Sequence, residues 1–141
     1  MASITKFSEG LTLGIHSLIV MGSNKDHKYR VNELATMFGA SEHHLSKIMQ
    51  RLAKGDFVKG FRGPKGGYVL SKDISEITLM DVFVLIEGEI DSVGCLLQRQ
   101  ICDGNCFLGP LLNTIHNDFQ NYFNKTTIES IVNQMKPNPN L

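Results

Sequence analysis

The sequence predicts a mainly α-helical chain that carries one small β-hairpin. Apolar residues recur at helical spacing in successive stretches along the chain. One stretch, residues 57–70, instead has β-forming residues on both sides of the glycine- and proline-containing sequence RGPKGG. The 141 residues can bury one core and add a protruding element, but they are too few for two large domains.

The first part of the chain predicts three helices, the second and third of which are short and joined by a tight turn. Residues 7–21 form a first predicted helix, because apolar side chains recur there every three or four positions. We expect Asn32 to cap a second helix that ends at Gly39, and Ser41 to cap a third that ends near Gly55. Two short helices joined by a glycine-containing turn are typical of a helix-turn-helix.

A basic hairpin follows these helices. Strands are expected at 57–61 and 68–70, around a tip that glycines allow to turn sharply and a proline stiffens. Arg62 and Lys65 charge that tip. This order predicts a winged helix-turn-helix, which lays its second helix in a major groove and directs a wing arginine toward a phosphate or a minor groove. An ordinary hairpin, charged for solubility, is the alternative.

Positive charge is concentrated in this region, although the net charge of the whole chain is zero. Residues 43–72 hold one acidic residue, Asp56, and seven basic ones: Lys47, Arg51, Lys54, Lys59, Arg62, Lys65 and Lys72. A basic face of this kind favours a polyanionic partner. The alternative is a solvated surface with no partner.

The second part of the chain predicts three more helices. Thr78 is expected to cap one that ends at Gly88, and Thr126 with Glu129 forms a capping box for the last. Between them, residues 107–123 carry a broad apolar stripe of Leu108, Leu111, Leu112, Ile115, Phe119, Tyr122 and Phe123. Such a stripe on a late helix predicts packing against a second subunit, with packing onto the first helix as an alternative that can coexist with it.

The predicted organisation is a winged helix-turn-helix domain at 1–90, a cysteine loop at 91–106, a dimerisation helix with a C-terminal helix at 107–136, and a tail at 137–141. The start of the sequence lacks the apolar core of a secretion signal, and no apolar run is long enough to span a bilayer. We therefore expect a cytoplasmic protein with no membrane partner.

All three cysteines, Cys95, Cys102 and Cys106, lie within the stretch GCLLQRQICDGNCFLG. In a reducing compartment this favours metal ligation or thiol redox chemistry over a structural disulfide. A structural zinc site normally takes four ligands, and the nearest histidine, His116, lies ten residues beyond the last cysteine. An enzyme that uses Cys106 as nucleophile and His116 as base lacks a third orienting group. A pure protein adaptor would leave the wing without a purpose.

Together these segments resemble a known family. The stretch RVNELATMFGASEHHLSKIMQRLAKGDFVKGFRGPKGGYVLSKD, the start ITKFSEG, the helix ITLMDV and the three-cysteine loop are similar to the IscR/NsrR family of bacterial winged-helix transcription regulators. The resemblance implies a homodimer that binds double-stranded operator DNA and is not an enzyme. It also implies an iron-sulfur cluster in the cysteine loop.

The resemblance also implies which side chains face DNA. They are Ser41, His43, His44, Ser46, Lys47 and Arg51 on the recognition helix, with Arg62 and Lys65 on the wing. Lysine, serine and histidine can bond to base edges or phosphates. Lys54, Lys59 and Lys72, together with Lys65, are expected to contact phosphates, which fix the position of the protein on the duplex.

For the cluster, the resemblance implies Cys95, Cys102 and Cys106 as ligands, with Glu9 of the second subunit as the fourth. The spacing C-x6-C-x3-C departs from the more even family spacing, and Gly109 stands where some members have a histidine ligand. A 4Fe-4S cluster is favoured, with 2Fe-2S as the alternative. Its loss or nitrosylation is expected to re-aim the recognition helices in response to redox, nitric oxide or iron. The alternative is a winged-helix regulator whose cysteines are thiol switches.

Overall fold

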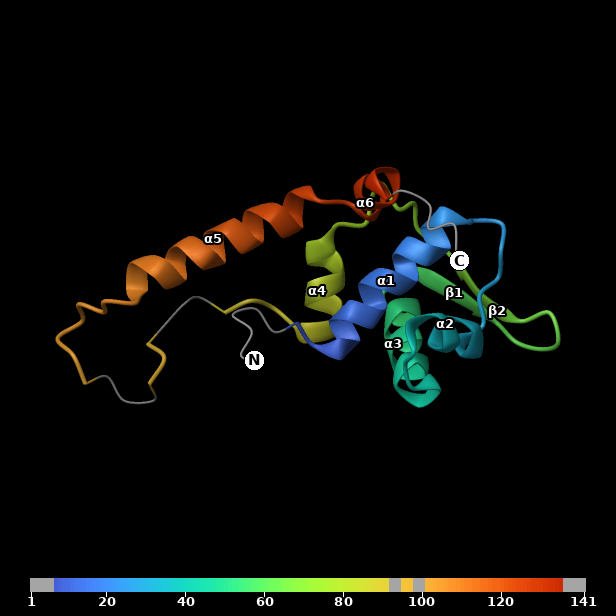
Figure 1. Cartoon of the computed structure of the whole chain (residues 1–141), viewed down its shortest axis with the longest axis horizontal. Coiled ribbons are helices and arrows are strands. Elements are labelled where there is room, and N and C mark those ends of the chain that lie inside the picture. The colour runs from blue at the N-terminus through green and yellow to red at the C-terminus, as the bar shows by residue number, and fades with distance from the viewer. Residues whose placement is uncertain (1–6, 92–94, 98–100, 136–141) are drawn as a thin grey trace.

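A computed structural model describes residues 7–91, 95–97 and 101–135 of the chain. The elements are α1 (Glu9–Ser23), α2 (Val31–Phe38), α3 (Glu42–Lys54), β1 (Val58–Phe61), β2 (Gly67–Leu70), α4 (Leu79–Glu87), α5 (Gly109–Lys125) and α6 (Ile128–Gln134). Figure 1 shows α1 to α4, the hairpin and α6 gathered into one body, from which α5 extends as an arm. The predicted mainly helical fold with a hairpin wing is confirmed.

Helix α1 runs through the centre of the body and contacts α3, α4, α6 and β2. Its side chains Leu11 and Leu18 are almost completely buried. Gly14 allows α4 to approach closely, because a Cβ atom at this position would lie 2.4 Å from Cδ1 of Ile86. The contact with α4 brings the start of α1 close to the part of the chain that leads into the cysteine loop of residues 91–106, called the cysteine segment from here on.

The helix-turn-helix forms as predicted at its turn. Gly39 adopts a left-handed conformation with φ of 62°, which a glycine adopts at little cost. The hydroxyl of Ser41 then accepts a hydrogen bond from the backbone N–H of His44 at 3.3 Å and caps α3. The chain therefore leaves α2 and enters α3 through the residues that the sequence indicates.

The predicted start of α2 is wrong by two residues. Arg30 is the N-cap residue, and Asn32 lies in the first turn, where its Oδ1 accepts from the N–H of Glu33 at 2.9 Å. The cause is a strand-like pairing just before the helix. Tyr29 exchanges backbone hydrogen bonds with Tyr68, so the chain stays extended up to Arg30 and the helix begins directly afterwards.

The wing is a two-stranded antiparallel hairpin in which Val58 pairs with Leu70 and Phe61 pairs with Gly67. These strands differ from the predicted ones by one residue at each start. Tyr29 adds a single bridge on the other side of β2, with N–H···O distances of 3.0 and 2.7 Å to Tyr68. A segment from before α2 thus lies along the open side of β2.

Threonine side chains cap the N-termini of α4 and α6. Thr78 and Asp81 form a capping box at α4, as the predicted position of the cap requires. The predicted capping residue of α6 is wrong by one position: Thr127 is the N-cap, and its Oγ1 accepts from the N–H of Ser130 at 3.1 Å. Thr126 ends α5 instead, because its carbonyl is held by the N–H of Leu79 at 2.9 Å.

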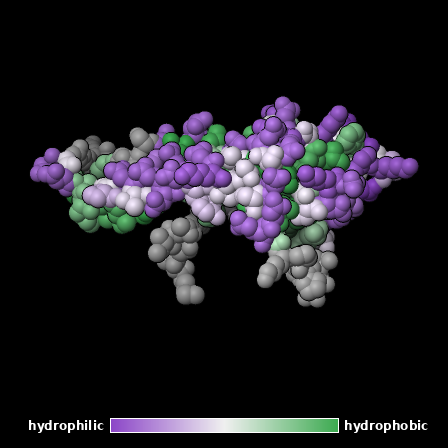
Figure 2. Space-filling view, turned by 90° about the horizontal axis from the view of Figure 1, so that it is seen from above, coloured by the Kyte–Doolittle hydropathy of each residue, from purple (hydrophilic) through white to green (hydrophobic). Residues whose placement is uncertain are grey.

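The arm packs on the body only near its C-terminal end, as far as the described residues show. Phe119 and Phe123 contact Phe83 of α4 and Phe7, which lies just before α1. Four large apolar side chains of the arm region remain exposed: Phe107 just before α5, and Leu111, Ile115 and Tyr122 along it. Figure 2 shows apolar residues gathered along one side of the arm. Among the described residues, no helix is both long and apolar enough to cross a membrane.

Candidate nucleic-acid interface and cysteine segment

Helix α3 separates an apolar face from a polar one. Leu45, Ile48, Met49 and Leu52 are buried and fix the helix on the body. On the other face, Ser41, His43 and Lys47 are exposed, and His44 and Ser46 are half-buried. The structure therefore presents the predicted recognition side chains on the surface of one helix.

The basic side chains of α3 and the wing are not neutralised by any carboxylate in the described residues. Among the described residues, the ion pairs are His27 with Glu33 and His44 with Glu9. No lysine or arginine in this part of the chain has a carboxylate partner. Unpaired positive charge on one surface is the electrostatic footprint of a nucleic-acid partner.

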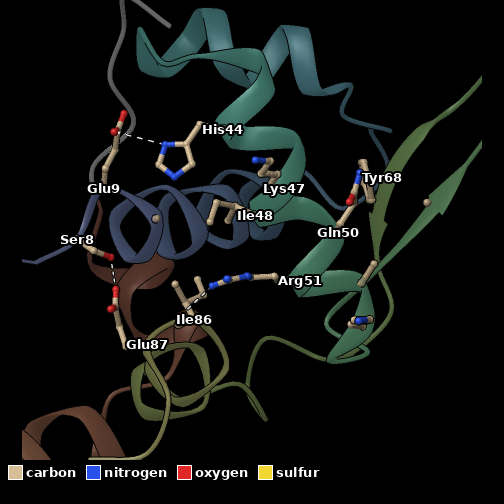
Figure 3. Close-up of a pocket in the computed structure, with 14 residues that line it drawn as sticks. Ser8, Glu9, His44, Lys47, Ile48, Gln50, Arg51, Tyr68, Ile86 and Glu87 are labelled. Carbon is tan, nitrogen blue, oxygen red and sulfur yellow. Dashed lines mark hydrogen bonds and ion pairs between the residues drawn. The ribbon is translucent and has the colours of Figure 1, made fainter.

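An open groove of about 900 Å³ lies beside α3, between the start of α1, the end of α4 and the hairpin. Figure 3 shows Lys47 and Gln50 on its α3 side, with Gln50 near Tyr68 of β2. Ile48 and Ile86 form its apolar floor. The groove thus brings the recognition helix, the wing and the segment before the cysteines next to one another.

Arg51 connects α3 to α4. Its Nη1 donates a hydrogen bond to the carbonyl of Ile86 at 3.0 Å (Figure 3). The carbonyl groups in the last turn of a helix lack partners within that helix, so Arg51 satisfies one of them. Next to it, the Ser8 hydroxyl donates to the carboxylate of Glu87. The end of α4 is therefore tied to both α3 and the start of α1, and the predicted DNA contact of Arg51 stays a prediction.

Glu9, the predicted fourth cluster ligand, is the first residue of α1. One of its carboxylate oxygens, Oε2, lies 3.4 Å from Nδ1 of His44 on α3. Figure 3 shows the two side chains turned toward each other across the gap between the helices. The structure thus joins a predicted cluster ligand to a predicted DNA-contacting residue within one chain.

The wing presents the other predicted contacts. Arg62 and Lys65 are exposed at its tip, and Lys54 is exposed in the last turn of α3. Lys59 lies over the ring of Phe61, with Nζ 5.4 Å from the ring centroid. Lys72 lies over Phe57 at 5.6 Å. These cations are arranged around the hairpin, as the sequence predicts.

The sequence reasoning missed two basic residues that contact the wing. Nζ of Lys28 lies 4.6 Å from the centroid of Phe61, and Nη2 of Arg30 donates to the carbonyl of Pro64. Both precede α2, in a stretch interpreted from the sequence as a loop. The signal that could have found them is the pattern Lys28-Tyr29-Arg30, in which charged residues alternate with a β-forming one.

The cysteine segment lies at the far end of the arm in Figure 1. Cys95, Cys102 and Cys106 are exposed and free. Gly104 has φ of 99°, and its carbonyl accepts from the N–H of Cys106 at 3.2 Å. By chemistry, three accessible thiols suit iron-sulfur ligation. Within the described part of one chain, no three His, Cys, Asp or Glu side chains are gathered as a metal site, so a complete set needs a rearranged loop or a second chain.

Comparison with known proteins agrees with this geometry. The Rrf2 family, described as iron-dependent transcriptional regulators, matches residues 7–134. The chain belongs to the Rrf2 family. It is therefore a DNA-binding winged-helix regulator of transcription and not an enzyme.

Three individual proteins illustrate what this Rrf2 chain is similar to. The transcriptional regulator IscR of Photorhabdus laumondii is 30% identical over 100 residues, which cover 70% of this chain and 60% of that protein. The structure of CymR, the global cysteine regulator of B. subtilis, superposes with a TM-score of 0.78 at 24% identity, over 94% of this chain and all of CymR. IscR of T. potens superposes with a TM-score of 0.73 at 18% identity, over 96% and 95% of the two chains. These two structural likenesses show the Rrf2 fold.

Proposed function

We propose that this Rrf2 regulator binds operator DNA as a homodimer and senses a redox, nitric oxide or iron signal through an iron-sulfur cluster in its cysteine segment. The observation that carries the proposal is the link between the two regions. Arg51 of α3 holds the end of α4, after which the chain enters the cysteine segment. A change in that segment therefore acts directly on the helix proposed to read DNA.

DNA binding is proposed for the exposed face of α3 and the wing. Ser41, His43, His44, Ser46 and Lys47 are assigned to base edges and nearby phosphates in the major groove. Arg62 is assigned to the minor groove, where a narrow groove attracts arginine. Phosphate contacts are assigned to Lys54, Lys59, Lys65 and Lys72, and to Arg51 if it leaves the carbonyl of Ile86. The absence of carboxylate partners for these cations among the described residues supports this assignment.

Homodimerisation is proposed for the arm. Leu111 and Ile115 are 55% and 48% exposed and lie four residues apart in α5, and Phe107, 88% exposed, lies just before the helix. Side chains spaced in this way lie on one face of a helix. Burying this face against the same face of a second copy removes it from water and forms the self-complementary interface of a two-fold dimer.

For the cluster, we propose Cys95, Cys102 and Cys106 as ligands, with Glu9 of the partner subunit as the fourth. Such a cluster, favoured as 4Fe-4S, supplies a redox-active centre that small molecules can attack. Glu9 pairs with His44 in the single chain. Ligation through Oε2 of Glu9 therefore requires the contact of that oxygen with His44 to break, whereas ligation through Oε1 leaves it possible.

A second candidate keeps the DNA binding and replaces the cluster by thiol chemistry. It is favoured by the exposure of all three free cysteines, since accessible thiolates are the ones that oxidise. In this candidate, sulfenic acid or a disulfide in the segment changes the position of the end of α4.

The test measures DNA affinity with and without the cluster. A duplex enriched from a random library by the wild-type chain is titrated anaerobically, before and after reconstitution with iron and sulfide. We expect the two affinities to differ by about tenfold, a typical coupling between two sites. The matched control replaces all three cysteines by serine and should show no difference. Equal affinities in the wild type would contradict the cluster proposal, and a peroxide response of the cluster-free protein would favour thiol switching.

Glu9→Ala tests the fourth ligand, with Glu76→Ala, an exposed glutamate outside the groove, as the matched control. We expect Glu9→Ala to shorten the lifetime of the reconstituted cluster and to change its absorption spectrum. Glu76→Ala should leave both unchanged, because Glu76 is not among the proposed ligands. An unchanged lifetime and spectrum in Glu9→Ala would remove Glu9 from the ligand set.

A further inference from the structure

The segment before α2 lies against the wing like a short third strand. Figure 1 shows the chain from α1 to α2 passing beside β2. Tyr29 exchanges two backbone hydrogen bonds with Tyr68, and its side chain is buried. Burial, together with Glu33, raises the pKa of the Tyr29 phenol. Side chains alternate along an extended segment, so Lys28 and Arg30 lie on the solvent side, and both are exposed.

Lys28 adds a cation to the wing. Its Nζ lies 4.6 Å from the centroid of Phe61, and Nζ of Lys59 lies 5.4 Å from the same centroid. An aromatic face attracts cations, so the exposed ring of Phe61 holds two ammonium groups at the surface. Neither lysine has a carboxylate partner among the described residues. Two such charges beside one ring fit the closely spaced phosphates of a DNA strand.

Arg30 holds the tip of the wing. Its Nη2 donates to the carbonyl of Pro64, which lies two residues after Arg62. Helix N-caps favour Ser, Thr, Asp and Asn, whose short side chains bond to the first turn. Arginine at the N-cap of α2 lacks that advantage, and its guanidinium instead reaches across to the wing. The residue is thus placed to fix the tip relative to the helix-turn-helix.

We propose that Lys28 and Arg30 are functional parts of the DNA-binding wing. Lys28 contacts a DNA phosphate beside Phe61, and Arg30 is a positioning residue that fixes the tip from which Arg62 enters the minor groove. This inference rests on the proposed binding of DNA by α3 and the wing. It extends the basic surface from the hairpin onto the segment between α1 and α2.

The contact of Lys28 is tested with Lys28→Ala and, as matched control, Lys125→Ala. Lys125 is an exposed lysine in the last turn of α5, outside the proposed DNA-binding surface. Affinity for the enriched duplex is measured over a series of salt concentrations. We expect Lys28→Ala to reduce the slope of log K against log salt by about one, the contribution of one phosphate contact, and Lys125→Ala to leave it unchanged. A wild-type slope in Lys28→Ala would overturn the phosphate contact.

The role of Arg30 is tested by combining Arg30→Gln with Arg62→Ala. Arg30→Gln should reduce the preference for an A·T-rich over a G·C-rich flank, as Arg62→Ala does, because an unheld tip presents Arg62 poorly. The double variant should bind no more weakly than Arg62→Ala alone, since residues that act as a unit are not additive. Additive losses would overturn the positioning role, and Arg30→Lys should restore part of the preference.

Failure of the proposed DNA binding and failure of the proposed role of Lys28 and Arg30 give different experimental results. If the wild-type chain binds no duplex at any salt concentration, the proposed function is wrong and the inference falls with it. If the wild-type chain binds with a steep salt dependence and neither variant changes it, only the role of Lys28 and Arg30 is wrong. Thermal unfolding of each variant shows that the changes in affinity do not come from unfolding.

Discussion

The body and the arm of this regulator are stabilised in different ways. In the body, side chains of Ser41 and Thr78 cap α3 and α4, and the core residues Leu34, Leu45 and Val82 are fully buried. The arm begins without a side-chain cap at Leu108, and its large apolar side chains Leu111, Ile115 and Tyr122 are exposed. The core of the body is thus formed within one chain, whereas the outer part of the arm is exposed, and we propose that a second copy of the chain covers it.

This difference between body and arm fits the proposed division between DNA binding by the body and sensing by the cysteine segment. A rigid body keeps the side chains of α3 and the wing in a fixed arrangement, which base recognition requires. A segment on the arm can change without disturbing that core. The two regions meet at the end of α4, where Arg51 and Ser8 bond to Ile86 and Glu87, and at the aromatic contacts of Phe83. We propose that a change in the cysteine segment reaches α3 through these contacts.

The largest effect on stability is expected in the body. Leu45→Ala removes a fully buried side chain between α3 and the rest of the core. We expect the free energy of unfolding to fall by about 2–5 kcal/mol, the cost of a large-to-small change with a cavity. Chemical denaturation measures it. Leu111→Ala, a leucine on the exposed face of the arm, is the matched control and should cost much less when measured on the monomer.

An intermediate effect is expected on assembly. Ile115→Asp places a charge in the middle of the exposed apolar face of α5. We expect the dimer to weaken by about 2–4 kcal/mol, as at a central interface residue, while the unfolding of the monomer changes little. Sedimentation measures the dissociation constant. Asn113→Asp adds the same charge on the same helix outside the apolar stripe, so a comparable loss there would refute the proposed interface.

The smallest effect is expected at a cap. Thr78→Ala removes the hydroxyl that accepts from the N–H of Asp81 at 3.1 Å. We expect the body to lose about 1 kcal/mol, and Thr78→Ser to retain most of the stability because the serine hydroxyl can make the same bond. Thermal unfolding of the three proteins checks the order. Equal stability of the alanine and serine variants would show that the capping box contributes nothing measurable.

The sequence predicts the local features of the body well and the relations between distant segments poorly. Gly39, Ser41 and Thr78 carry strong local signals, and each occupies its predicted role. The cap of α2 is displaced because Tyr29 pairs with Tyr68, a contact that no local pattern records. In the same way, Thr126 is held by Leu79, which moves the cap of α6 to Thr127.

In the candidate site, too, local features follow from the sequence, whereas contacts between distant segments do not. The exposed recognition face of α3 follows from its helical period, so Lys47 and His43 are on the surface as predicted. The pairing of Glu9 with His44, the bond from Arg51 to Ile86 and the contact of Arg30 with the wing join segments far apart in the chain. The ligands of the proposed cluster are proposed to come from two subunits, so their assembly depends on an interface that a single chain does not contain.

The most direct test of the central claim is a native mass spectrum of protein purified without oxygen. Our account predicts a dimer heavier than two chains by two clusters, and the added mass identifies the cluster as 4Fe-4S or 2Fe-2S. A dimer at the bare mass of two chains, even after reconstitution with iron and sulfide, would contradict the cluster and leave a winged-helix regulator with thiol switches. A monomer would contradict the proposed role of the arm as well.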